Sequence, residues 1–321
     1  MNRLLSSMLL LAAACLPALA HGADYPTQTV RIVVPFGPGG GTDLAARAIA
    51  EQLTASLGKP VLVENRPGGN SVIASQAVAA APADGHTLLL TTDIHAINAA
   101  YAMKLPYDSL TGFAFVAQLT TSPLMLVAHP SSGMQTVAEL VRRAKAAPGR
   151  LTFASLGPSS PHYLGFEWFE RMAGIDVVDV PYKGGGQALA DTLGGQVDLS
   201  LIVAGNGIRQ ARAGKLLALA VTSPRRTAIA PDVPTIAESG YPEFALVNWY
   251  AILAPAGTPP AIVERLNREI GRALREQSVI DRLVGAGLEP TTGSPAELET
   301  LVRQHVDKYR RIIALTGAKL E

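Results

Sequence analysis

The feature that most constrains this chain is a repeated alternation of short apolar runs with segments of helical periodicity. Aliphatic runs at 30–34, 61–63 and 87–90 have strand length, and patterns of helical spacing such as 44–57 follow them. Strands separated by helices at this spacing indicate βαβ units and a mainly parallel sheet. Further strands are expected at 116–119, 124–128, 151–154, 177–180, 197–202 and 217–221, with helices at 71–80, 137–146, 162–172 and 188–193 and helices alone after Pro255.

Residues 1–23 have the pattern of a secretory signal peptide. Arg3 precedes an apolar run over 8–14, and an Ala-Leu-Ala cleavage site occupies 18–20. The apolar run is shorter than the roughly 20 residues that a membrane-spanning helix needs, which disfavours the alternative of an N-terminal anchor helix. We therefore expect the protein to be exported.

Cys15 is the only cysteine, and cleavage after residue 20 leaves a chain without cysteine. Such a chain has no disulfide framework, cysteine nucleophile or thiolate metal site. An exported protein without cysteine fits the bacterial periplasm. The alternative is a lipoprotein with its lipid on Cys15, which Ala12 disfavours because a lipobox usually has leucine there.

The charge of the chain excludes some classes of partner. Without Arg3, the 27 basic residues become 26, which equals the number of acidic residues. A chain of zero net charge has no basic field that would attract nucleic acid or anionic lipid. Any anion that binds here must therefore be held by local geometry.

The length of the exported chain, about 300 residues, suggests roughly two domains. No long flexible linker divides them, but the tripeptide Thr-Ser-Pro occurs at both 121–123 and 222–224. Two crossings of this kind form a hinge. We predict a first domain over 24–121 and 224–321, and a second domain over 122–223.

A glycine-rich segment at 35–41, Pro-Phe-Gly-Pro-Gly-Gly-Gly, joins a predicted strand to a predicted helix. It is not a P-loop, because Thr42 follows the glycines where a P-loop has lysine. It is not a dinucleotide loop, because Asp43 would oppose a pyrophosphate. Glycines let a ligand approach the backbone, and the start of a helix favours an anion. The segment predicts an anion site or, as the alternative, a tight turn capped by Asp43.

Three more loops follow predicted strands and carry hydrogen-bond donors. They contain Ser155, Gly157, Ser159, Ser160 and His162 in one, the run Tyr182-Lys183-Gly184 in another, and Thr92, His95 and Asn98 in a third. Donors at the start of a helix again favour an anion. In the alternative interpretation the serines only cap a helix, His162 only begins it, and Lys183 is only solvated.

Motifs of reactive chemistry are absent from the sequence. It has no H-E-x-x-H site and no G-x-S-x-G elbow, and no serine or histidine has an evident triad partner. Donor loops without a reactive group indicate a binding protein. We predict no metal and no cofactor. The rival is a periplasmic enzyme acting on a carboxylate with His162 or His95 as its base.

A series of segments in the right order resembles the Bug family, the periplasmic substrate-binding proteins of tripartite tricarboxylate transporters, also called the TctC family. The resemblance runs from about residue 25 to residue 317. Its segments are VRIVVPFGPGGGTDLAARAIAEQL, VENRPGGNSVIAS, ADGHTLLL, HAIN, LPYD, VPYKGGGQALADTLGGQVD, LLALAVTSPRR, PDVPTIAESGYP and WYAILAPAGTP.

The resemblance implies an α/β, type II periplasmic-binding-protein fold, in which two α/β domains joined by two crossing strands close on a ligand. In this family, loops of both domains hold a ligand carboxylate, partly through ordered water. The matching residues here are Pro35, Phe36, Gly37, Gly39, Gly40, Thr42 and Asp43 in the first domain and Ser155, Ser159, Ser160 and His162 in the second. The resemblance places Tyr182, Lys183, Gly184, Thr92, His95 and Asn98 around the rest of the ligand.

The family also implies a function. We expect a monomer that captures a small carboxylate, which is a dicarboxylate, tricarboxylate, amino acid or aromatic acid, and delivers it to the membrane subunits of a secondary transporter. The alternative is a sensor that presents its ligand-bound form to a signalling partner.

The chain departs from the family pattern at two places. Ala154-Ser155-Leu156-Gly157 stands where many relatives have Ser-Ser-Gly or Ser-Ala-Gly. Leu201-Ile202, followed by Val203, stands where many have a Phe-Asp pair. If that aspartate holds an amino or hydroxyl group of the ligand, its absence favours a ligand with an apolar far end, which we treat as a hypothesis.

Overall fold

The computed structural model describes residues 25–320, so the predicted signal peptide lies outside the described residues. The strands are β1 (Val30–Val34), β2 (Val61–Asn65), β3 (Thr87–Thr92), β4 (Phe113–Ala128), β5 (Thr152–Ser155), β6 (Val178–Pro181), β7 (Leu199–Val203), β8 (Leu217–Val221), β9 (Val247–Pro255) and β10 (Glu289–Pro290). The α-helices are α2 (Gly41–Leu57), α3 (Val72–Ala79), α4 (Ile94–Ala100), α5 (Val137–Ala146), α6 (Pro161–Ala173), α7 (Gly185–Leu193), α8 (Ala204–Arg212), α9 (Pro260–Ala273), α10 (Gln277–Gly285) and α11 (Pro295–Thr316).

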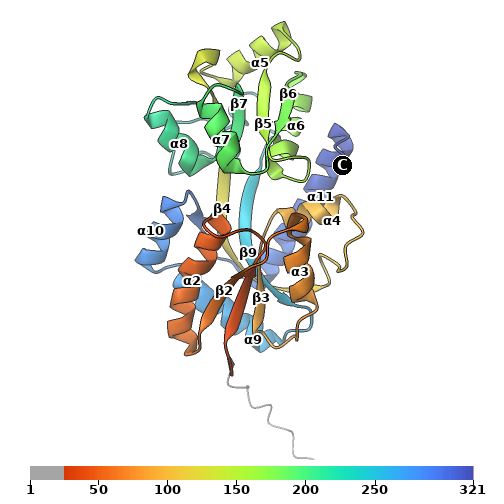
Figure 1. Cartoon of the computed structure of the whole chain (residues 1–321), viewed down its shortest axis with the longest axis vertical. Helices are drawn as coiled ribbons and strands as arrows, with labels where there is room; N and C mark the ends of the chain where they lie inside the picture. The colour runs from red at the N-terminus through yellow and green to blue at the C-terminus, as the bar shows by residue number, and fades with distance from the viewer. Residues whose placement is uncertain (1–24, 321) are drawn as a thin grey trace, which may run out of the picture.

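The molecule has two lobes, one above the other in Figure 1, joined by the long strands β4 and β9. In the lower lobe β1 runs parallel to β2 and β3, and β9 lies antiparallel between β3 and β4. In the upper lobe β5 runs parallel to β6 and β7, and the second half of β4 pairs antiparallel with β7 and β8. The parallel sheet with helical crossovers confirms the predicted α/β class.

Side chains alternate across the lower sheet and enter two separate cores. Leu88 and Leu90 of β3 pack in a cluster with Ile49 and Ile270, which belong to α2 and α9. Leu89, which lies between them in the sequence, packs in the cluster that includes residues of α3, α4 and α11. Successive strand residues point to opposite faces, and both faces here are covered by helices. This explains why the strands appear as continuous apolar runs in the sequence.

β4 corrects the expectation of two separate strands at 116–119 and 124–128. The structure has one strand of 16 residues that continues through Thr120-Thr121-Ser122-Pro123. Threonine favours extended backbone, and the fixed φ of proline is compatible with it. The polar tripeptide is therefore the crossing part of a strand, where Thr121 lies opposite Trp249 and Pro123 lies opposite Val247.

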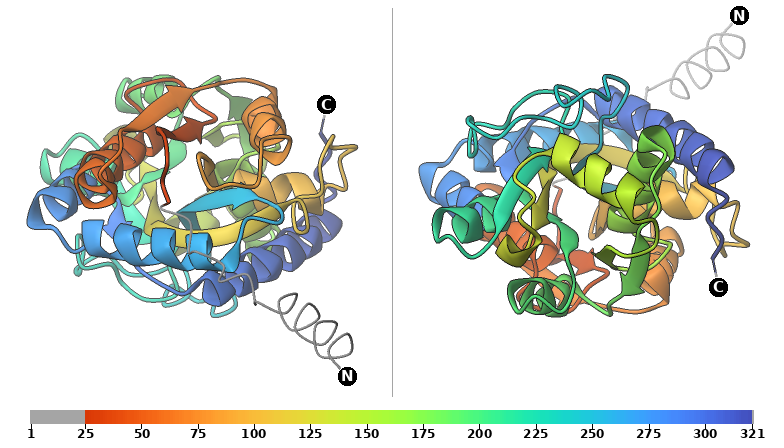
Figure 2. Two further views of the ribbon diagram at one scale, coloured as in Figure 1. Left: turned by 90° about the horizontal axis from the view of Figure 1, so that it is seen from below. Right: turned by 90° about the horizontal axis from the view of Figure 1, so that it is seen from above.

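The return of the chain to the lower lobe takes place in β9, a strand that our element assignment missed. After β8 the chain stays with the upper lobe: Ile236 donates to the carbonyl of Val221 at 3.0 Å, and the ring of Phe244 stacks on that of Trp168 at 4.8 Å. The view from below in Figure 2 shows β9 and β4 side by side, in agreement with their pairing. Our assignment also missed α4 and α8, which are short and have no side-chain cap hydrogen bond.

Within residues 25–320, none of the helices has both the length and the apolar character that crossing a membrane requires.

Candidate functional site

The glycine-rich loop lies between β1 and α2, at the side of the lower lobe that faces the upper lobe (Figure 1). Beneath it, the carboxylate of Asp43 is almost fully buried and accepts three hydrogen bonds, from Gly39 N at 2.9 Å, Arg47 Nε at 3.0 Å and Asn65 Nδ2 at 3.0 Å. Asn65 Nδ2 also donates to the carbonyl of Phe36 at 2.9 Å. Burial alone would raise the pKa of Asp43, but these hydrogen bonds hold it below its usual value. Asp43 therefore shapes the loop from below.

The donors that this loop leaves available are at the start of α2. Gly40 is the N-cap residue and has no side chain to satisfy the first turn, so the N–H groups of Gly41 and Thr42 have no partner within the helix. The N–H of Gly39, which has a φ of 85°, is used by Asp43. A methyl group on Gly41 would lie 2.9 Å from the phenol oxygen of Tyr250, so glycine is required for this close approach. Pro35 is buried, Phe36 is half-buried, and Gly37 is exposed.

The serine loop between β5 and α6 has one free hydroxyl and two that are engaged. Ser160 is the N-cap of α6; its Oγ accepts from Tyr163 N at 3.2 Å and donates to the carbonyl of Gly157 at 2.7 Å. Ser155 Oγ is buried and accepts from Gly157 N at 3.2 Å. Ser159 is half-buried, and its hydroxyl makes no hydrogen bond to any described residue. Ser159 is therefore the serine whose hydroxyl is available to a ligand.

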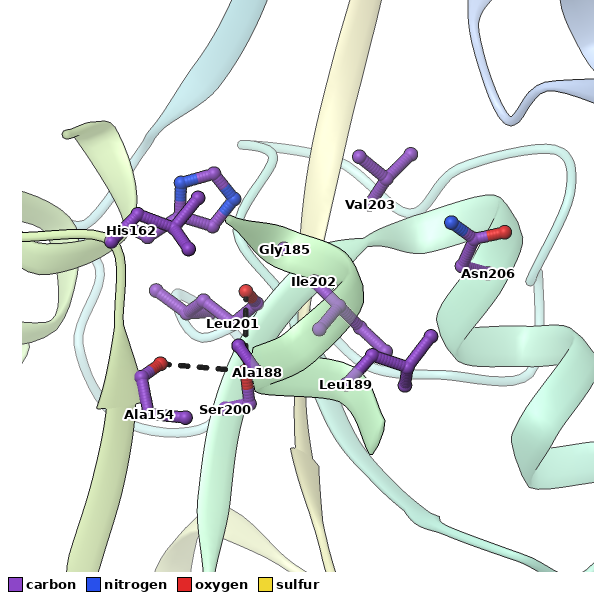
Figure 3. A pocket seen from close by; sticks show the side chains of 11 residues that line it. Ala154, His162, Gly185, Ala188, Leu189, Ser200, Leu201, Ile202, Val203 and Asn206 are labelled. Atoms are coloured by element: carbon purple, nitrogen blue, oxygen red, sulfur yellow. Dashed lines mark hydrogen bonds between the residues drawn. The ribbon is translucent and has the colours of Figure 1, made fainter. Parts of the chain in front are cut away.

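His162 lies in the first turn of α6 and lines a small cavity of the upper lobe (Figure 3). Burial lowers the pKa of its imidazole to about 4, so the ring is neutral at neutral pH. Its Nδ1 is buried and has no hydrogen-bond partner among the described residues. The ring therefore forms part of the cavity wall and has one nitrogen without a partner within residues 25–320.

The third predicted loop, at Tyr182-Lys183-Gly184, joins β6 to α7. The N–H of Tyr182 donates to the carbonyl of Ser155 at 2.9 Å, which places this loop directly beside the serine loop. Lys183 is exposed, and Gly184 is the N-cap of α7, again without a side chain to satisfy the first turn. The starts of α6 and α7 thus present donors close together in the upper lobe.

The side chains of the fourth predicted group, Thr92, His95 and Asn98, make their contacts inside the lower lobe. His95 is fully buried between the rings of Tyr107 and Phe113, its Nε2 is 2.7 Å from the carbonyl of Ser109, and burial lowers its pKa to about 4. Asn98 is also fully buried, and Thr92 Oγ1 accepts from Ile94 N at 3.3 Å. None of these contacts places their side chains beside the glycine-rich loop.

Asn98 forms two hydrogen bonds with Asn70, in the turn before α3. Its Oδ1 accepts from Asn70 Nδ2 at 2.7 Å, and its Nδ2 donates to the carbonyl of Asn70 at 2.9 Å. Asn70 and Ser71 both have positive φ, of 51° and 69°, which non-glycine residues rarely adopt. The two hydrogen bonds hold this strained turn before α3. His95, Asn98 and Thr92 therefore support the lower lobe from within.

Our sequence analysis missed a buried polar cluster around Asp93. The carboxyl of Asp93 is nearly inaccessible and accepts from the phenol of Tyr309 at 2.9 Å, and burial raises its pKa to about 7. The pKa of Tyr250 is raised by burial and by the charge of Asp93. No local sequence signal links these groups, because Tyr309 lies 216 residues after Asp93.

One hydrogen bond joins the two lobes directly across the site. The phenol of Tyr101, which follows α4 in the lower lobe, donates to the carbonyl of Pro158 in the serine loop at 2.8 Å. Within residues 25–320, no cluster of three or more His, Cys, Asp or Glu side chains is placed to hold a metal ion. The residues thus assemble donor-rich helix starts on both lobes, which is the geometry of a two-lobed periplasmic solute-binding protein.

The comparison with known proteins agrees with this class. Residues 45–318 match the model of the tripartite tricarboxylate transporter family receptor, TctC. Protein BugT of Bordetella pertussis is 36% identical over 324 residues, which cover 100% of this chain and 99% of the relative. The chain belongs to the Bug, or TctC, family and is a periplasmic solute-binding protein of that family.

Solved structures extend the comparison to ligands. The periplasmic binding protein BugD has a TM-score of 0.80 at 30% identity and covers 92% of this chain and 100% of its own. MatC from Rhodopseudomonas palustris with bound malate has a TM-score of 0.79 at 33% identity, covering 90% of this chain and 100% of its own. An R. palustris protein with adipate has a TM-score of 0.82 at 34% identity, covering 91% of this chain and 98% of its own. These neighbours confirm the predicted periplasmic-binding-protein fold.

Proposed function

We propose that this protein captures a small carboxylate in the periplasm and delivers it to the membrane subunits of a tripartite tricarboxylate-type secondary transporter. The observation that carries the proposal is the pairing of donor-rich helix starts on the two lobes: α2 below, and α6 with α7 above, of which α2 and α7 have no side-chain cap. Helix starts with free N–H groups favour an anion, and a carboxylate bridging them would be held by both lobes. The malate and adipate in the two R. palustris neighbours support a carboxylate as the ligand.

The contact set of this proposal is narrower than the set that the resemblance implied. We assign direct contact to Gly40 and to the N–H groups of Gly41 and Thr42 at the start of α2, to Ser159 of the serine loop and His162 of α6, and to the backbone of Gly184. Asp43, Ser155 and Ser160 position these loops through the hydrogen bonds described above. Phe36, Gly37, Tyr182 and Lys183 border the cleft, and His95 and Asn98 are left out because their side chains are consumed inside the lower lobe.

Ligand capture would close the lobes about the two crossing strands. We place the first crossing at Thr121–Pro123, as predicted, and the second at the start of β9 near Leu246. The second placement is supported by the N–H of Leu246, which donates to the carbonyl of Thr222 at 2.8 Å, and by the packing of the Leu246 side chain against Gly165 of α6. Residues 224–246 would then move with the second domain.

Native mass spectrometry of the protein purified from its host tests the binding part of the proposal. We expect one retained species whose mass corresponds to a small carboxylic acid, and that acid should raise the melting temperature of ligand-free protein. Recovery of the acid unchanged after long incubation is the result expected of a binder. A protein that no carboxylate stabilises, or one that converts the acid, would contradict the proposal.

Delivery needs a separate test. The ligand-loaded protein should stimulate uptake of the same acid into vesicles that contain the membrane subunits, and the ligand-free protein should not. Capture of a signalling protein instead of the membrane subunits, with no uptake, would favour the sensor.

A further inference from the structure

The upper lobe contains a cavity of about 90 Å³ beside the serine loop, between β5, β7 and the starts of α6, α7 and α8 (Figure 3). Most of its wall is aliphatic and comes from Leu156, Ala188, Leu189, Leu201, Ile202 and Val203. Three of these are the consecutive residues 201–203, the segment that departs from the family pattern. The cavity therefore adjoins the proposed carboxylate site and presents a different chemistry.

The polar groups of the cavity wall are few and carry no charge. Ser200 Oγ donates to the carbonyl of Ala154 at 3.4 Å, and Asn206 Oδ1 accepts from Arg209 Nη2 at 2.7 Å. His162 Nδ1 has no partner, and its ring is neutral at neutral pH because burial lowers the pKa to about 4. No lysine, arginine or acidic residue lines the cavity.

This apolar wall would favour one of two ligands that have the same first carboxylate. One has a second carboxylate at its far end, and the other has an alkyl chain there. A second carboxylate in the cavity would lose its water and meet no cation, which is costly in an apolar site. An alkyl chain would gain from burial, at roughly a fourfold increase in affinity for each methylene group removed from water. In the alternative binding mode, a second carboxylate stays at the mouth of the cavity and binds the N–H groups that begin α7 at Gly185. The experiment below separates this mode from an alkyl tail inside the cavity.

The size of the cavity sets the length and shape of the chain that it accepts. Its volume of about 90 Å³ is the share of about three water molecules in the liquid. An engineered cavity that binds benzene is larger, at about 150 Å³. The cavity is smaller than that one, so a short alkyl chain suits it better than an aromatic ring.

We propose that this cavity is a subsite for a short aliphatic tail, so that the ligand is a monocarboxylate with an unbranched or singly branched alkyl end. The inference rests on the proposed function, because it takes the carboxylate to be held by the loops of the two lobes. It gives residues 201–203 the role of selecting the ligand through its far end.

The test is isothermal titration of ligand-free, full-length mature protein with hexanoate, adipate and benzoate. Hexanoate and adipate have equal length and differ only in the far carboxylate. We expect hexanoate to bind at least tenfold more tightly than adipate and than benzoate. Equal affinities, or tighter binding of adipate, would overturn the inference and leave carboxylate binding intact. Tighter binding of benzoate would overturn the size limit. Failure of every carboxylate to bind would overturn the proposed function as well.

A filled cavity provides the second readout. Ala188 is buried in the cavity wall, and Ala188→Leu places a larger side chain in the cavity. Acetate is the control ligand, because it has a carboxylate and no alkyl tail to enter the cavity. We expect the variant to lose at least tenfold in hexanoate affinity and to keep its acetate affinity. Equal losses for both acids would contradict a separate tail subsite. Should the variant unfold, the comparison of the acids on the unaltered protein decides the matter.

Discussion

The phenol of Tyr101 donates a hydrogen bond of 2.8 Å to the carbonyl of Pro158, and this contact ties the lower lobe to the serine loop of the upper lobe. The two residues follow elements of different sheets, β3 with α4 and β5 respectively. The contact therefore exists only while the lobes keep their present relation. It links the arrangement of the two lobes to a single hydrogen bond.

Tyr101→Phe should weaken ligand binding without unfolding either lobe. Loss of one neutral hydrogen bond costs about 1 kcal/mol, which corresponds to roughly a fivefold loss of affinity if the contact forms part of the bound state. Titration of the ligand measures the affinity, and small-angle X-ray scattering measures the distribution of lobe arrangements. Tyr241→Phe is the matched control, because Tyr241 packs on Phe169 within the upper lobe. Equal affinity in the two variants would show that the contact has no role in binding.

Asp43→Asn should loosen the glycine-rich loop. The substitution removes the charge that accepts from Gly39, Arg47 and Asn65, and we expect a loss of about 1–2 kcal/mol in the free energy of unfolding together with weaker ligand binding. Urea unfolding and titration provide the two measurements. Glu64→Gln is the control, because its ion pair with Arg66 is exposed and should contribute no more than about 0.5 kcal/mol. A loop that binds ligand unchanged after Asp43→Asn would remove Asp43 from the positioning role.

Two neighbouring serines should differ in what their hydroxyl groups do. Ser160→Ala removes the N-cap of α6 and should lower the free energy of unfolding by about 1 kcal/mol. Ser159→Ala should leave unfolding unchanged and weaken ligand binding by about 1 kcal/mol, because this hydroxyl is the available donor. Thermal unfolding measures the stability of both variants, and titration measures their ligand affinity. The opposite pattern would exchange the roles that the structure assigns to them.

Acid should destabilise the protein through His305. This residue is buried on α11, its Nδ1 accepts from Trp249 Nε1 at 3.1 Å, and burial lowers its pKa to about 3. A histidine that is neutral when folded and protonated when unfolded costs stability as the pH falls from about 6.5, the ordinary pKa, towards 3. The loss is at most about 4 kcal/mol over that range.

His305→Gln tests this assignment, because glutamine keeps an acceptor for Trp249 and does not titrate. The free energy of unfolding, measured in urea between pH 7 and pH 4, should fall less steeply in the variant than in the unaltered protein. His129→Gln is the control at a half-buried position, where the ring contacts Ser131. Identical pH profiles for His305→Gln and the unaltered protein would exclude His305 as the source of the acid sensitivity.

The sequence predicted most of the elements because both faces of the sheets are covered. Strand runs such as 30–34 and 217–221 coincide with β1 and β8, and the glycine that ends α2 at Gly58 has the expected positive φ, of 71°. The missed β9 is a nine-residue, mostly apolar run that the assignment overlooked, whereas two other differences follow from weaker local signals. β4 contains polar residues in its crossing part, and α4 spans only seven residues.

The candidate site was predicted in outline only. The sequence indicated the loops, because glycine and serine at the start of a helix leave N–H and hydroxyl donors. It did not separate Ser159 from Ser160, or Gly39 from Gly40, since which of two adjacent groups is already bonded depends on contacts made after folding. His95 illustrates the limit: its residue type suggested a ligand contact, and the aromatic side chains around it make it part of the interior.

The sequence by itself determined the α/β class, the family, and the loops that follow the strands, because local periodicity and turn chemistry are written in neighbouring residues. Tertiary structure alone decided which donors remain free, where the chain crosses for the second time, and that residues 201–203 line a cavity next to His162. It also brought Asp93 to Tyr309 across 216 residues. Such pairings depend on how the sheets and helices pack, and no pattern in the separate segments specifies that packing.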